Sequence, residues 1–137
     1  MPTVSTSPVD ELQESMFNLL SNDAELPDVY DEVPEDAPMP YIRIGEFLTI
    51  PSNNHDTFGR EVVGTVHVWT RARSNRPGQI IATRIGERLD HQVDALVMPN
   101  HTVGVIRQEL DQALRDPTPG IRHHVLRFRI HTSQQED

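Results

Sequence analysis

The chain has 137 residues, a formal net charge of −9 and 36% hydrophobic residues, which predicts one domain with a modest core. It contains no cysteine, which excludes a disulfide framework and thiolate chemistry, and no apolar run approaches the length of about 18 residues that a membrane span needs. The negative charge and the scattered arginines argue against nucleic-acid binding. Without a signal-like N-terminus, we expect a soluble, intracellular protein.

Residues 1–7 are expected to be a flexible lead-in to a domain spanning residues 8–132. A helix is predicted from Ser7, which can cap it, to Asn22. Its apolar residues recur at helical spacing: Val9, Leu12, Met16, Leu19 and Leu20.

Residues 24–40 contain four prolines, which exclude a helix and a central strand. We expect an extended, solvated arm pinned by Val29 and Tyr30. Calcium binding is the alternative, but the acidic spacing is not that of an EF-hand and Pro34 interrupts it. The arm carries much of the acidic charge, since residues 1–42 hold ten acidic residues and no basic one, whereas all twelve arginines follow.

Residues 41–50 alternate as a strand, and one face is predicted to carry Ile42, Ile44, Leu48 and Ile50. Glu46 interrupts that face and indicates a bulge or frayed point. Residues 51–59 are turn formers and predict an exposed hairpin loop. The candidate partner-binding residues of this loop are Asn53, Asn54, His55, Asp56 and Phe58.

Residues 61–71 predict a strand near the middle of the sheet, with an apolar face of Val62, Gly64, Val66 and Val68. Trp69 is interpreted as a residue packed between sheet and helix. A long helix follows, capped by Ser74 or Asn75, with Pro77 in its first turn. Its stripe contains Ile81, Ile85, Leu89, Val93 and Leu96.

Residues 102–114 fit a strand or a helix, and we interpret them as a strand. Asp116–Gly120 predicts a turn before a last strand over residues 121–131. Arg127 and Arg129 share the face of that strand opposite its apolar residues, where they are either solvated or paired with carboxylates of a neighbouring subunit. Residues 133–137 are predicted to be a disordered tail.

The predicted order is helix, short strand, hairpin, helix and two strands. It indicates an α+β fold in which two helices pack on a mostly antiparallel or mixed sheet of about four to five strands.

Seven histidines suggest a metal-dependent enzyme, but no HExxH pattern occurs, and His123 and His124 must face opposite sides of their strand. Solvated histidines are the simpler interpretation. No nucleophile elbow or phosphate-binding loop is present. We therefore expect no enzymatic activity, no metal and no cofactor.

The chain contains, in this order, the segments LLSNDAEL, VYDEVPEDAPMPYIRIGE, VGTVHVWTRARS and GIRHHVLRFRIHT. In the order of these segments, residues 10–132 resemble the tail-completion, or tail-terminator, proteins of long-tailed bacteriophages. The chain departs from that pattern in its acid-rich N-terminal third and in a longer link after the second helix.

The resemblance implies a virion protein, assembled in the host cytoplasm, that forms a hexameric ring. Such a ring caps the tail tube, ends its polymerisation and joins the neck, while DNA passes through without specific binding. A head–tail adaptor or head-closure protein is the alternative in the same setting. The candidate subunit contacts are Asp28, Asp31, Glu32, Glu35, Asp36, Arg127 and Arg129.

Overall fold

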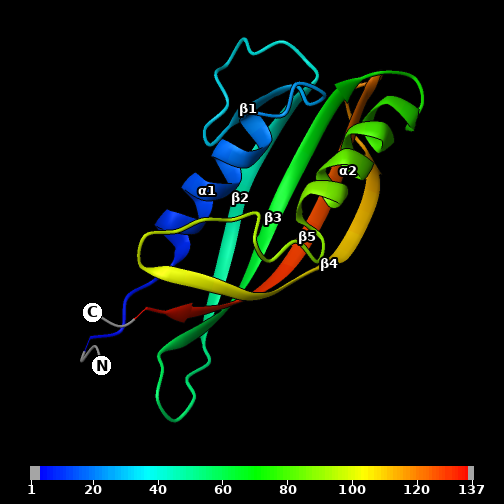
Figure 1. Ribbon diagram of the computed structural model, residues 1–137. Helices are drawn as coiled ribbons and strands as arrows, with labels where there is room; N and C mark the ends of the chain where they lie inside the picture. Colours follow the sequence, from blue (N-terminus) through cyan, green and yellow to red (C-terminus); the bar gives the residue numbers. More distant parts are fainter. Residues whose placement is uncertain (1–3, 136–137) are drawn as a thin grey trace.

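The computed structural model describes residues 4–135 and consists of a five-stranded sheet with two helices on one face (Figure 1). The strand order is β1-β2-β3-β5-β4, in which β1 is parallel to β2 and every other pair is antiparallel. This is the predicted α+β fold. The elements are α1 (Val9–Ser21), β1 (Asp28–Tyr30), β2 (Tyr41–Pro51), β3 (Gly59–Arg71), α2 (Arg76–Leu89), β4 (His101–Arg115) and β5 (Ile121–Gln134).

The core lies between the two helices and one face of the sheet. The predicted alternation is confirmed in β3, which occupies the centre of the sheet, and in β5, because the inward side chains of both strands are fully buried. Residues 102–114 are confirmed as a strand within β4. The fully buried apolar residues of α1, β3 and β5 are Leu12, Met16, Leu20, Val62, Val66, Val68, Leu126, Phe128 and Ile130.

A bulge in β2 confirms the irregularity predicted at Glu46 but overturns the predicted apolar face. The register with β3 shifts between Ile44 and Phe47, which reverses the direction of the side chains that follow. Leu48 and Ile50 are therefore 59% and 46% exposed instead of buried with Ile44. Phe47 turns to the core instead.

The second helix ends at Leu89, seven residues before the predicted limit at Leu96. The backbone of Asp90 is extended and His91 adopts a φ of 62°, so the helix cannot continue. The Asp90 carboxylate accepts a hydrogen bond from the Gln108 backbone N–H at 2.8 Å, which ties the helix end to β4. Val93 lies outside the helix and is 37% exposed.

Two local predictions at the ends of elements are also corrected. Asn75 stands at the start of α2 without a side-chain capping bond. Ser133 and Gln134, predicted in the disordered tail, belong to β5. The Gln134 side chain accepts the Thr6 backbone N–H at 2.9 Å and donates to the Val4 carbonyl at 2.9 Å, within the predicted lead-in. The rest of the lead-in and tail, residues 1–3 and 136–137, lies outside the described residues.

No helix among residues 4–135 has both the length and the apolar character that a membrane span requires.

Candidate assembly surfaces

The acidic arm, which we define as Asp28, Asp31, Glu32, Glu35 and Asp36, lies at the β1 edge and in the connection from β1 to β2. All five side chains are exposed, as predicted for a solvated arm. Asp31 accepts a hydrogen bond from Gln13 of α1. Within residues 4–135, none of the five carboxylates forms an ion pair.

The two arginines predicted as subunit contacts, Arg127 and Arg129, have different environments. Arg129 contacts Glu109 on β4 and donates to Glu61 on β3 at 2.9 Å, so its partners lie within the chain. These hydrogen bonds, with Glu109 first, raise the pKa of the Arg129 guanidinium. Arg127 is exposed and makes no ion pair with the described residues.

A second basic surface, which the sequence did not predict, lies where β3 and β4 end and β5 begins. We name the set of Arg73, Arg115 and Arg122 the arginine end. These three residues line a hollow of about 380 Å³. Arg115 and Arg122 are opposite each other in the β4–β5 register. Arg122 donates to the Arg73 carbonyl at 2.7 Å, which holds the turn after β3 against β5. The prediction of scattered arginines is therefore wrong here, because folding brings three segments together.

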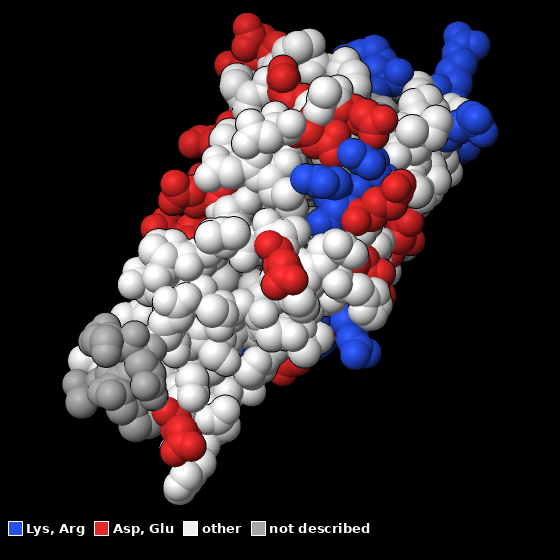
Figure 2. Space-filling view, in the orientation of Figure 1, with Lys and Arg blue, Asp and Glu red and all other residues white. Residues whose placement is uncertain are grey.

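The two charged surfaces lie on opposite sides of the same end of the molecule. In Figure 2 acidic side chains gather at the upper left, over the β1 side shown in Figure 1, and basic ones at the upper right. Tyr41, Trp69, His123 and Leu114 form one row across β2, β3, β5 and β4. The arm leads into Tyr41, and Arg115 follows Leu114, so the row joins the two surfaces.

The sheet face opposite the helices carries a stack of aromatic rings near this end. Trp69 and His123 are parallel within 6°, with centroids 3.8 Å apart, and His67 contacts His123 at 2.7 Å between ring nitrogens. Glu46 contacts the other nitrogen of His67 at 3.1 Å. The interpretation of Trp69 as a residue between sheet and helix is thus wrong, since it points away from the helices. Burial and His67 lower the pKa of His123 to about 4.

His124 confirms that the adjacent histidines face opposite sides. It is fully buried on the helical side, beneath Gly78 of α2, where an added Cβ would lie 2.4 Å from the imidazole. Burial lowers the pKa of His124, so the ring is neutral at pH 7. His101 is also buried, 3.0 Å from Glu11. The expectation of solvated histidines therefore fails at His101 and His124.

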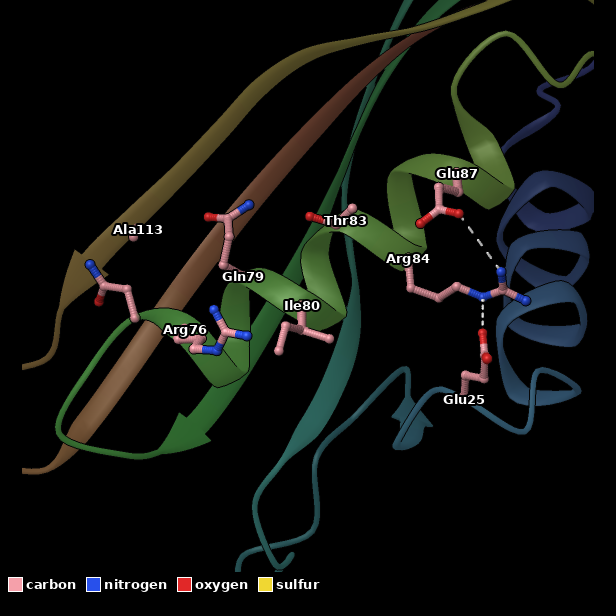
Figure 3. A pocket seen from close by; sticks show the side chains of 9 residues that line it. Glu25, Arg76, Gln79, Ile80, Thr83, Arg84, Glu87 and Ala113 are labelled. Carbon is pink, nitrogen blue, oxygen red and sulfur yellow. Dashed lines mark ion pairs between the residues drawn. The ribbon is translucent and has the colours of Figure 1, made fainter.

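A hollow of about 1080 Å³ lies on the outer side of α2 (Figure 3). Arg84 reaches across it and contacts Glu25 at 3.0 Å and Glu87 at 3.9 Å. It also contacts Asp23 at 2.9 Å, which ties α2 to the connection after α1. Burial opposes ionisation of Asp23, but the Glu25 backbone N–H and Arg84 outweigh it and lower the pKa of Asp23.

The lining of this hollow includes no histidine, serine or cysteine that could form a nucleophile–base pair. Within residues 4–135, no three His, Cys, Asp or Glu side chains are grouped to hold a metal ion. This hollow therefore offers a concave contact surface with ion-paired side chains.

The predicted partner loop lies at the opposite end of the sheet from the arm (Figure 1). Asn53, Asn54, His55 and Asp56 are exposed, whereas Phe58 is half-buried and its carbonyl accepts the Gln134 backbone N–H at 2.8 Å. Asn53 accepts the Gly59 backbone N–H and Asn54 that of Asp56, both at 3.1 Å. The loop thus presents an ordered polar tip. Phe58 lies at its base.

Comparison with known proteins gives a matching family model and solved structures of similar fold. The family model described as "Tail completion protein gp17" matches residues 14–133. A chain from a structure described as "Virion of native gene transfer agent (GTA) particle" is similar with a TM-score of 0.83 and 21% identity. The similarity covers 94% of this chain and 99% of that one, and it establishes the shared fold. No curated protein matches the sequence.

Proposed function

Because this chain belongs to the tail completion protein gp17 family, we propose that it is a structural protein of a phage-like tail whose copies close a ring on the tail tube. The ring, expected to be hexameric, ends tube polymerisation and joins the tail to the neck. The observation that carries this proposal is the family match across residues 14–133. The described surfaces support it, because they carry exposed charged groups that can contact neighbouring copies.

The ends of the molecule have different roles in this proposal. The arm and the arginine end share one end and supply lateral contacts between copies. The loop tip, residues 53–56, points the other way and contacts the tube or the neck (Figure 1). A ring of identical subunits needs two different complementary patches on each copy. The arm and the arginine end are the two patches in this proposal, and the loop tip leaves the other end of each subunit for the next layer of the tail.

DNA passes through the proposed ring without specific binding. Each phosphate that a protein neutralises strengthens DNA binding, and DNA that must travel through a channel gains nothing from being held. The net charge of −9 supports a lumen that repels phosphates, with part of the carboxylate excess at its mouths.

The capping role is tested by adding the purified chain to tail tube protein during polymerisation and imaging the product. We expect short tubes with a ring on one end. A variant with Asn54→Ala and His55→Ala at the loop tip should leave the ring intact but cap tubes less well. Asn18→Ala and Asn22→Ala, exposed residues at the C-terminal end of α1, serve as the control pair. Tubes that lengthen equally with and without the chain would refute the proposal.

A further inference from the structure

We propose that, within the ring, the arginine end of each copy binds the acidic arm of the next copy. This inference rests on the proposed ring and names the residues that close it. The arginine end is Arg73, Arg115 and Arg122, and the arm is the set of five carboxylates between Asp28 and Asp36.

The position of the two surfaces fits a head-to-tail contact. The arm is at the β1 edge, and the arginine end includes the last residue of β4, the opposite edge strand. Both lie at the same end, at the two limits of the row from Tyr41 to Leu114. Copies placed side by side at one level therefore bring the β4 edge of one to the β1 edge of the next. The two surfaces of a single copy are separated by the width of the sheet.

Neither surface is neutralised within the described chain. The carboxylates of the arm and the guanidinium groups of the arginine end form no ion pairs among residues 4–135, whereas Arg43, Arg84, Arg88 and Arg129 do. Guanidinium groups bind carboxylates through paired, directional hydrogen bonds, so clustered arginines suit an acidic segment.

Arg129 fits this role less well than the arginine end. Glu61 and Glu109 already occupy its guanidinium group, and a neighbouring copy would have to displace one of them. DNA phosphate is the other anion that an arginine cluster could bind. The arm is favoured because every copy carries it beside the next β4 edge, whereas the net charge of −9 repels DNA.

The test uses a double and a triple variant of the full chain, each of which reverses the charge of one surface. The end variant carries Arg73→Glu and Arg115→Glu, which spares the Arg122 hydrogen bonds, and the arm variant carries Glu32→Arg, Glu35→Arg and Asp36→Arg. All five substituted residues are exposed. The control variant carries Arg60→Glu and Arg107→Glu, two arginines outside both surfaces that form no ion pairs among the described residues. Native mass is the measurement, and circular dichroism shows that each variant is folded.

We expect the wild-type and control chains to form the ring, and each of the other two variants to lose it when alone. An equal mixture should recover a ring of alternating copies, because every contact then joins opposite charges again. Recovery cannot arise from variants that fail to fold. If the wild type and the end variant alone both form rings, or if the mixture stays dissociated, the assigned contact between arginine end and arm is wrong. The proposed ring itself is not contradicted by either result. A wild type that never assembles would overturn both.

Discussion

At the residue scale, two adjacent histidines show how position on a strand decides chemistry. His123 stacks on Trp69 on the uncovered face, and His124 is enclosed beneath α2. Burial holds both as neutral rings, one half-buried and one fully buried. The alternation of a strand predicts the opposite faces. It does not predict that both sites disfavour charge, because that depends on neighbours from β3 and α2.

His123 makes folding stability depend on pH. Its pKa is about 4 in the fold against an ordinary 6.5, so the unfolded chain takes up this proton first as the pH falls. Its contribution is complete above about pH 6.5 and is lost as the pH falls towards 4. His123→Phe keeps the stack on Trp69 without a titrating group, and should flatten the fall in urea midpoint between pH 7 and pH 4.5. His55→Phe, at the exposed loop tip, is the control. Identical slopes for all three proteins would contradict this account.

Gly78 is required by the imidazole of His124. Alanine normally stabilises a helix by about 0.5–1 kcal/mol over glycine, but a Cβ here would lie 2.4 Å from the buried ring. We expect Gly78→Ala to lower the free energy of unfolding by about 1–3 kcal/mol. The matched control is Gly86→Ala in the same helix, whose Cβ would meet only the flexible end of Gln108 at 2.8 Å. Equal effects of the two substitutions in urea unfolding would rule out this role.

At the element scale, the sequence predicts which segments form strands and helices better than it predicts where those elements end and which way their side chains point. Period-two alternation predicted β3 and β5 together with their buried faces, because the alternation within a regular strand depends only on which of its own side chains are buried. In β2 the bulge after Ile44 reverses the alternation, so Leu48 and Ile50 were assigned to the wrong face. The arginine end was missed because no periodicity encodes the meeting of three segments. The family resemblance, by contrast, depended on the order of segments and was confirmed.

The early end of α2 leads to a prediction about Asp90. Its carboxylate would oppose the negative pole of a continuing helix, and it instead accepts the Gln108 backbone N–H at 2.8 Å. Asp90→Ala should lower the free energy of unfolding by about 1 kcal/mol or more, since it leaves that N–H without its partner. Faster amide exchange at Gln108 should accompany the loss. Asp94→Ala, an exposed acid in the following turn, is the control, and unchanged exchange at Gln108 would refute the assignment.

At the scale of the whole molecule, acidic and basic side chains gather on separate surfaces. The arm and the arginine end lie on opposite sides of one end, and the loop tip lies at the other (Figures 1 and 2). If the arginine end is covered by the next copy's arm, the assembled ring should not retain double-stranded DNA. Mobility-shift titration at low salt checks this. Retention by the ring that weakens steeply with salt would place arginines in the lumen instead.

The central claim, that this chain closes a ring, is tested most directly by the native mass of the purified wild-type protein, alone and with tube protein. We predict a closed assembly of about six copies of the 15.6 kDa chain, either alone or on the tube. A single 15.6 kDa subunit under both conditions would contradict the account.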